Sequence, residues 1–228
     1  MPRPIRICFA GALYHVFQRG NNKECIFVDD ADRWHFLKLC LEAKMQFGYF
    51  IYCYALMGNH FHMMIETPNP TPLSKIMQYI EGSYAMYFNK RHEHKGHLFQ
   101  GRFRDILVEK ERYMLALSCY IHLNPVKAGL AASPEDYKWS SFDIYAGRRT
   151  DRLVDTAKLL NCFDELDHEN ARNMYKEYVA ANGPAATSEK DWLEANLLRS
   201  RFLGSMSFLK QFQKRGQTPF VLDGKMGL

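Results

Sequence analysis

Residues 52–68 read Tyr-Cys-Tyr-Ala-Leu-Met-Gly-Asn-His-Phe-His-Met-Met-Ile-Glu-Thr-Pro. Two apolar runs flank the residues Met57-Gly58-Asn59, a pattern typical of two strands joined by a tight turn. Residues two apart in a strand share one face of the sheet. We therefore expect Phe61 and the apolar residues that alternate with it to enter a core, while His60 and His62 point together to the opposite side.

The two histidines suggest a metal site. Two imidazoles side by side on a rigid strand supply half of the ligands that such a site needs. The alternative is a surface strand with two solvated histidines, since histidine is also a common surface residue. The choice depends on what other parts of the chain bring to His60 and His62.

A second stretch, Tyr120-Ile-His-Leu-Asn-Pro-Val-Lys-Ala-Gly-Leu130, follows a helical pattern that begins at Glu111. Tyr120 and Asn124 are four residues apart, so they share one helix face if the helix extends that far. Pro125 makes this conditional, because the residue before a proline disfavours helical angles. A tyrosine and an amide could then face the two histidines. The alternative is a tyrosine at the edge of the core and a capping asparagine.

The periodicity of the first half of the chain predicts the order βαββαβ. Strands are expected at 12–19, 49–57, 60–67 and 103–109, and helices at 29–47, at 73–91 and from 111 onward. This order is the ferredoxin-like arrangement of the α+β class, with an antiparallel sheet and helices on one face. The other face is expected to be free for a site that includes the histidine pair.

Charge is unevenly distributed along the chain. Residues 1–150 contain 19 Lys and Arg against 14 Asp and Glu, whereas residues 151–228 contain 11 of each kind. The segment 90–104 is basic, aromatic and glycine-containing, so it is suited to neutralising phosphates and stacking bases. The alternative is a solvated loop with Phe99 and Phe103 in the core.

Composition also narrows the class of protein. No apolar run reaches the roughly 18 residues that would span a membrane, and we expect no membrane association. The first residues lack the apolar region of a signal peptide. The six cysteines are scattered and include no Cys-x-x-Cys pair, which is typical of reduced thiols. We therefore expect a cytoplasmic protein.

Six motifs occur together, at Pro2–Ile7, Gly11–Asn21, Asn59–Pro68, Gly96–Phe103, Tyr120–Leu130 and Trp139–Phe142. In this order they resemble the single-tyrosine HUH transposases of the IS200-like family, and most closely its REP-associated tyrosine transposase branch. The similarity covers roughly residues 1–148. One residue departs from the family pattern: proline usually precedes Asn59, and Gly58 here is expected to loosen the turn without touching the ligands.

The resemblance implies an enzyme that cleaves and transfers single-stranded DNA at or near hairpins. Tyr120 would be the nucleophile and would form a 5′-phosphotyrosine. His60 and His62, with Asn124 as the third ligand, would hold a divalent metal. Two imidazoles alone would favour a transition metal such as zinc, whereas the resemblance implies Mg²⁺ or Mn²⁺. The implied partner is single-stranded DNA with hairpin-forming repeats, bound by a monomer or a homodimer.

Basic residues around the expected site are candidates for contacts with DNA phosphates. They are Arg102, Arg104, Lys90, Arg91, Arg19 and Lys23. Two other classes of protein stay open. A metal-dependent nuclease that activates water would form no covalent adduct with DNA. A hairpin-binding protein on the same scaffold would not nick DNA at all.

Residues 149–228 are expected to form a helical C-terminal extension to a catalytic domain at 1–148. Helical patterns cover Thr156–Cys162, Glu169–Ala181 and Ser188–Arg199. The extension has no net positive charge, so we interpret it as packing on the catalytic domain rather than as a DNA-binding module.

Overall fold

A computed structural model of the chain describes residues 6–69, 71–182, 202–205, 207, 208 and 210. The expected helix at Ser188–Arg199 lies outside these residues, as does most of the motif that begins at Pro2. Within the described residues, no helix combines the length and the apolar character needed to cross a membrane.

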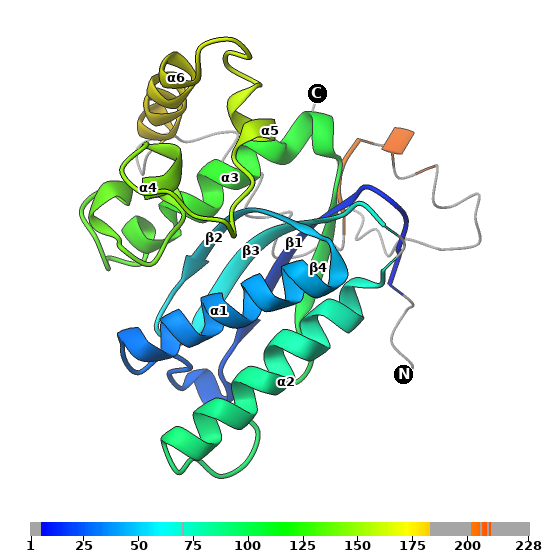
Figure 1. The fold of residues 1–228 in the computed structure, drawn as a ribbon, viewed down its shortest axis with the longest axis vertical. Helices are drawn as coiled ribbons and strands as arrows, with labels where there is room; N and C mark the ends of the chain where they lie inside the picture. Colours follow the sequence, from blue (N-terminus) through cyan, green and yellow to red (C-terminus); the bar gives the residue numbers. More distant parts are fainter. Residues whose placement is uncertain (1–5, 70, 183–201, 206, 209, 211–228) are drawn as a thin grey trace, which may run out of the picture.

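The elements follow the predicted order (Figure 1). They are β1 (Ala12–Arg19), η1 (Asn21–Lys23), α1 (Asp30–Phe47), β2 (Phe50–Leu56), β3 (His60–Thr67), α2 (Leu73–Arg91), β4 (Arg104–Val108), α3 (Lys110–Lys127), η2 (Pro134–Asp136), α4 (Phe142–Tyr145), α5 (Ala157–Leu160), α6 (His168–Ala181) and β5 (Phe202–Leu203). The first seven long elements begin and end within two residues of the predicted positions wherever a boundary was expected.

The strands form one sheet in the order β2-β3-β1-β4-β5. The first four strands are antiparallel to their neighbours, which is the ferredoxin-like arrangement expected from the sequence. The short β5 adds a parallel edge to β4, with Leu107 opposite Phe202 and Val108 opposite Leu203. A strand of two residues is too short to leave an alternating pattern in the sequence, so it was not expected.

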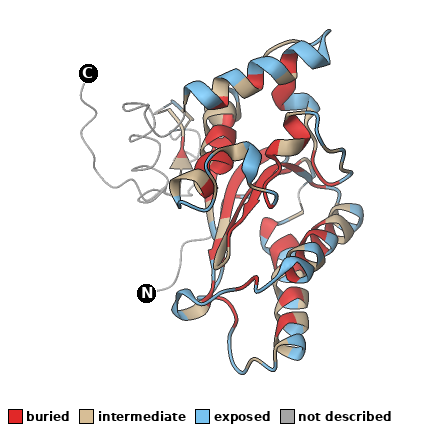
Figure 2. Ribbon diagram, turned by 90° about the vertical axis from the view of Figure 1, so that its left-hand side faces the viewer, coloured by how far each residue is buried: buried red, intermediate tan, exposed pale blue. Residues whose placement is uncertain are grey.

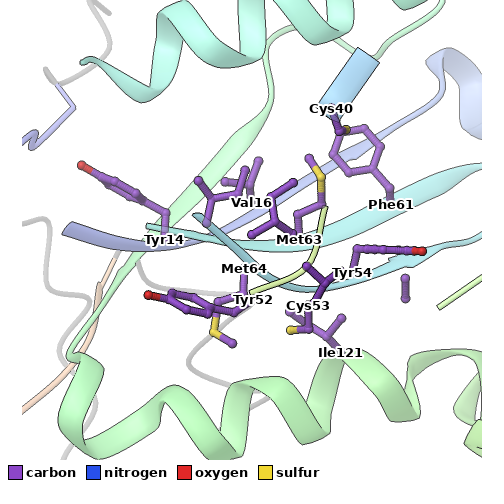
Figure 3. Packing of buried hydrophobic residues seen from close by; sticks show 14 of the residues in the cluster. Tyr14, Val16, Cys40, Tyr52, Cys53, Tyr54, Phe61, Met63, Met64 and Ile121 are labelled. Carbon is purple, nitrogen blue, oxygen red and sulfur yellow. The ribbon is translucent and has the colours of Figure 1, made fainter. Parts of the chain in front are cut away.

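Helices α1 and α2 cover one face of the sheet (Figure 1). Phe61 points into this layer, where its ring lies 4.8 Å from that of Phe36 in α1. Met63 points the same way (Figure 3). The predicted alternation in β3 is therefore confirmed: its odd-numbered residues enter the core beneath α1 and α2, and the histidines lie on the other face.

The other face is not bare, contrary to the expectation that it would be free. Helix α3 crosses it, so that the sheet lies between two helical layers (Figure 2). Ile121 of α3 packs toward Cys53 and Met64, which the sheet directs away from α1 and α2 (Figure 3). These buried apolar side chains require cover, and α3 supplies it while leaving the histidine end of the face to polar groups.

Helix α3 continues through Pro125 and ends at Lys127. The backbone N–H of Ala128 still donates to the carbonyl of Asn124 at 3.0 Å, and that of Leu130 donates to the carbonyl of Pro125 at 2.9 Å. Burial of Pro125 and its apolar neighbours against the sheet overrides the local preference against a helical residue before proline. The helix therefore extends past Asn124, as the sequence-based prediction required, and Tyr120 and Asn124 share one helix face.

The chain after α3 packs back onto it. Helix α6 places the fully buried Tyr175 with its hydroxyl 2.7 Å from Nδ1 of His122, and Nε2 of His122 lies 2.7 Å from Oγ of Ser141. The hydroxyl of Tyr175 also donates to Oγ of Ser118 at 3.1 Å. Helix α6 therefore packs against α3 through buried, hydrogen-bonded side chains.

Candidate active site

The histidine pair lies at the start of β3, directly after the turn at Met57–Asn59. The rings of His60 and His62 are 5.3 Å apart and nearly perpendicular. The carbonyl of Gly58 accepts backbone bonds from Ile26 and Phe27 at 2.9 and 3.0 Å. These bonds hold the turn in place even though it carries glycine, so the two histidines follow a fixed turn.

Asn59 orients the ring of His60. Its side-chain nitrogen donates to the carbonyl of Lys23 at 3.1 Å, which leaves Oδ1 as the atom that lies 2.7 Å from Nδ1 of His60. Because an amide oxygen only accepts, Nδ1 of His60 carries the hydrogen. Nε2 of His60 is then the nitrogen with a lone pair, as a metal ligand requires.

His15 of β1 contacts His62, and His15 was not singled out as a site residue from the sequence. Its Nε2 lies 2.9 Å from Nδ1 of His62, and the two rings stack with centroids 5.1 Å apart. The alternation of β1 could have revealed it, because the residues at 13, 15 and 17 share the face on which His62 lies. The motif at Gly11–Asn21 includes His15 but does not by itself indicate this contact, because His62 is distant in sequence.

Tyr120, on α3, contacts His62 and His15. Its ring meets that of His62 edge-on at 5.9 Å and that of His15 edge-on at 5.8 Å. Burial raises the pKa of the Tyr120 phenol, and a hydrogen bond with Asn124 opposes this effect. The phenol is therefore protonated in the free protein, and it needs nearby positive charge to become a nucleophile.

Asn124 and Lys127 extend the stripe of α3 that carries Tyr120. The side-chain nitrogen of Asn124 donates to the backbone carbonyl of Tyr120 at 2.9 Å, which leaves its Oδ1 as a possible ligand. The ammonium of Lys127 lies 4.9 Å from the centroid of the Tyr120 ring. An amide oxygen and a cation thus accompany the phenol on one helix.

The donor set fits a divalent cation. Burial lowers the pKa of His62 well below its usual value, with His15 and His60 adding to the effect. Burial and the neighbouring Arg19 also lower the pKa of His60, so both imidazoles are neutral, which is the form that coordinates metals. Among the described residues, no group of three or more His, Cys, Asp or Glu could hold a metal. Two neutral imidazoles and the amide oxygen of Asn124 are nevertheless donors of a kind that a divalent cation accepts.

Arg19, Lys23 and Arg104 lie around the histidines. Arg19 is opposite His60 in the pairing of β1 with β3. Arg104 is opposite Phe17 and lies 5.9 Å from the centroid of its ring, on the face that carries His62. Lys23 is tied to the histidine turn through its carbonyl. The structure therefore places Arg19 and Arg104 on strands beside the histidine pair, and it places the backbone of Lys23 next to the histidine turn.

The loop after α2 is anchored next to them. The carbonyl of Leu98 accepts from the backbone of Asn21 at 2.8 Å, and the backbone of Gln100 donates to the carbonyl of Arg19 at 3.0 Å. Phe99 and Phe103 are buried, as in the alternative interpretation of this segment. Arg102 remains exposed. The segment thus combines apolar anchors with an exposed basic residue.

Lys90 and Arg91 lie at the end of α2, in the helical layer that covers the other face of the sheet (Figure 1). The guanidinium of Arg91 bonds to Asp29 at 2.6 Å and to the fully buried Asp32 at 2.5 Å. Its pairing joins the end of α2 to the start of α1. The structure does not bring these two residues to the histidine pair.

The chain matches the family model described as "Transposase IS200 like" over residues 8–124. No curated protein matches it. Among solved structures, a REP-associated tyrosine transposase bound to a REP hairpin is similar in fold, with a TM-score of 0.55 and 17% identity, covering 69% of this chain and 96% of that chain. A structure described as a transposase from Deinococcus radiodurans has a TM-score of 0.38 and 15% identity, covering 51% of this chain and 94% of that one.

The family match spans more than half of the chain and extends from β1 to Asn124. It includes the histidine pair of β3 and Tyr120 of α3, which the structure brings together. The solved transposase supports the same sheet and helix arrangement. The chain therefore belongs to the IS200-like transposase family.

Proposed function

We propose that this protein nicks single-stranded DNA and transfers the cut strand through a 5′-phosphotyrosine on Tyr120. The observation that carries the proposal is the edge-on contact between Tyr120 and His62 at 5.9 Å. It places a phenol from α3 next to a pair of imidazoles from β3. Such a pairing of nucleophile and candidate metal ligands suits attack on a phosphodiester.

Tyr120 would perform the covalent step. Its phenol gives up its proton to solvent as the phenolic oxygen forms a bond to phosphorus. The bond from phosphorus to the 3′ oxygen breaks, and that oxygen takes up a proton from solvent and leaves as a 3′-hydroxyl. The phosphodiester energy is kept in the phosphotyrosine. A 3′-hydroxyl of another strand can then attack phosphorus and release the phenol, so strand transfer needs no ATP.

Three side chains would hold the divalent metal, Mg²⁺ or Mn²⁺. They are His60 and His62 through their Nε2 atoms and Asn124 through Oδ1. When bound, the metal supplies Lewis acidity that polarises the scissile phosphate. The chain's own contribution is to fix the imidazole rings, through Asn59 and His15, and to keep Tyr120 on the same side of the sheet.

The DNA backbone would contact the basic residues next to the histidines. Arg19 and Arg104 are the best placed, with Lys23 and Arg102 on the adjoining loops. Lys90 and Arg91 stay candidates for a more distant contact with DNA. Of the six basic residues proposed to contact DNA, Arg91 is the weakest candidate, because it is already paired with two carboxylates. The hairpin bound by the structural relative motivates a hairpin-forming substrate here.

A gel assay for covalent adducts tests the proposal. The full chain is incubated with a labelled single-stranded oligonucleotide containing a hairpin, with and without Mn²⁺. We expect a slower, denaturant-resistant band only with Mn²⁺. Tyr120→Phe should abolish the band while leaving DNA binding nearly intact. Tyr113→Phe is the matched control, since Tyr113 lies two turns earlier on the same helix.

The alternatives give different results in the same assay. A nuclease that activates water would cut the oligonucleotide without a covalent band, and Tyr120→Phe would still cut. A hairpin-binding protein would shift the oligonucleotide without nicking it. A covalent band that persists in Tyr120→Phe but disappears in Tyr113→Phe would move the nucleophile to Tyr113.

A further inference from the structure

His15 is a polar residue in an apolar setting. It lies in the middle of β1 with only 1% of its surface exposed, between the register partners Met64 of β3 and Ile106 of β4. Among the described residues, its Nδ1 has no hydrogen-bond partner. Burying an imidazole in this way costs free energy, so its presence needs a reason other than packing.

The contacts of His15 connect the two halves of the site. Its ring stacks on that of Phe17 at 5.1 Å and on that of His62 at 5.1 Å with an interplanar angle of 15°. It meets the ring of Tyr120 edge-on at 5.8 Å and 82°. The ring of His15 thus contacts both His62 on β3 and Tyr120 on α3.

Among the described residues, the side chain of His15 makes one hydrogen bond, to His62. The form in which His62 could bind a metal determines which of the two imidazoles donates in this bond. A neutral imidazole carries hydrogen on one nitrogen and a lone pair on the other. If Nε2 of His62 is to coordinate a metal, the hydrogen has to be on Nδ1. The 2.9 Å bond then runs from Nδ1 of His62 to Nε2 of His15. The opposite direction would place a hydrogen on Nε2 of His62 and block it as a ligand.

We propose that His15 is a positioning residue that fixes the ring and the tautomer of His62, so that Nε2 of His62 is held ready for a divalent cation. This inference rests on the proposed function. Ligating histidines are usually oriented by a carboxylate, a carbonyl or water. Here the acceptor is an imidazole, which orients His62 without adding negative charge where a DNA phosphate has to enter.

The test measures Mn²⁺ affinity by isothermal titration calorimetry on the full chain without DNA. His15→Gln can present an amide oxygen near the position of Nε2, whereas the shorter His15→Asn cannot. We expect Mn²⁺ to bind about 10-fold to 100-fold more weakly to His15→Asn. His15→Gln should stay within about threefold of the parent protein, because it restores an acceptor for His62.

Met64→Leu is the matched control, since it alters packing opposite His15 and removes no hydrogen bond. It should keep the parent affinity. The inference is overturned if His15→Asn binds Mn²⁺ as tightly as the parent, or if His15→Gln loses as much affinity as His15→Asn. If circular dichroism shows that His15→Asn is unfolded, the Mn²⁺ affinity of His15→Gln is the test: an affinity within about threefold of the parent supports the inference, and a larger loss overturns it.

Failure of the inference and failure of the proposed function give different results. Unchanged Mn²⁺ affinity in the Asn variant, with an adduct still formed by the parent, removes only the positioning role of His15. A parent protein that neither binds Mn²⁺ nor forms an adduct contradicts both. A parent that binds Mn²⁺ and responds to the His15 variants but forms no adduct keeps the positioning role and contradicts the cleavage mechanism.

Discussion

The hydroxyl of Tyr175 in α6 lies 2.7 Å from Nδ1 of His122 in α3, two residues beyond Tyr120. The same hydroxyl donates to Ser118 at 3.1 Å, and His122 reaches Ser141 through its other nitrogen at 2.7 Å. These side chains are buried, and each has a partner. Helix α3, which carries the proposed nucleophile, is thus held in place by hydrogen bonds to Ser141 and Tyr175, which come later in the chain.

Removal of the Tyr175 hydroxyl should destabilise the protein. Tyr175→Phe leaves Nδ1 of His122 and Oγ of Ser118 without this partner in a buried setting, at a cost of about 1–3 kcal/mol in the free energy of unfolding. Urea denaturation followed by circular dichroism measures the change. Tyr79→Phe is the control, because the hydroxyl of Tyr79 makes only a 3.4 Å bond to Glu42. Equal stabilities of the two variants would contradict the prediction.

Loss of either histidine should remove most DNA cleavage. His60→Ala and His62→Ala each delete one of two imidazole ligands, which weakens both metal affinity and orientation. EDTA should have the same effect on the parent protein. Asn124→Ala should lose less activity, since an amide oxygen is a weaker ligand that water can replace. Cleavage rates on a labelled oligonucleotide measure these effects. Undiminished cleavage in EDTA would contradict the metal-dependent mechanism.

The basic residues should separate into two groups. Neutralising Arg102 and Arg104 together should weaken binding to single-stranded DNA and flatten its dependence on salt, by about 0.7 in the slope for each lost contact. Arg91→Ala should instead leave the slope nearly unchanged and lower the free energy of unfolding, because the buried carboxylate of Asp32 loses a cationic partner. Fluorescence anisotropy at several salt concentrations tests both statements. A slope that falls with Arg91→Ala and not with the double variant would reverse the assignment.

Glu81 of α2 should make stability depend on pH. Burial raises the pKa of its carboxyl from 4.5 to about 8, against a smaller opposite effect of Arg6, and its Oε1 has no hydrogen-bond partner among the described residues. Since the folded pKa is the higher one, the stabilisation is present below pH 4.5 and is lost as the pH rises toward 8. The loss is at most about 1.4 kcal/mol per pH unit in this window.

Glu81→Gln should abolish that part of the pH dependence. Urea denaturation at several pH values should show the variant gaining stability relative to the parent between pH 4.5 and 8. Glu177→Gln, at an exposed position of α6, is the control and should follow the parent. A constant difference between Glu81→Gln and the parent across this range would refute the prediction.

The order of elements was predictable because the patterns are long and regular. The alternation through Phe61 and the helical period that reaches Tyr120 depend on burial of one face, which local sequence records. Contacts between distant residues leave no such record. The bond of His15 to His62 joins two strands, and the commitment of Arg91 to Asp32 joins two helices. For the same reason, the distribution of basic residues in the sequence could not show that Arg91 pairs with carboxylates whereas Arg104 lies beside the site.

Helix α3 was the least predictable element. Its passage through Pro125 depends on burial against the sheet, which a local rule about proline does not include. The free face expected from the βαββαβ order was wrong for a related reason. The sheet directs apolar residues such as Met64 to that side, and their need for cover becomes visible only when the strands are paired.

The parallel pairing of β5 with β4 bears on self-association. An open strand edge is a template on which a second chain can add its own strand. In the described part of the chain, residues 202 and 203 occupy the outer side of β4, while Val154 and Ser140 form bridges to the outer side of β2. These short segments cover part of each outer strand, and they therefore reduce the length of open edge on which a strand of a second copy could pair.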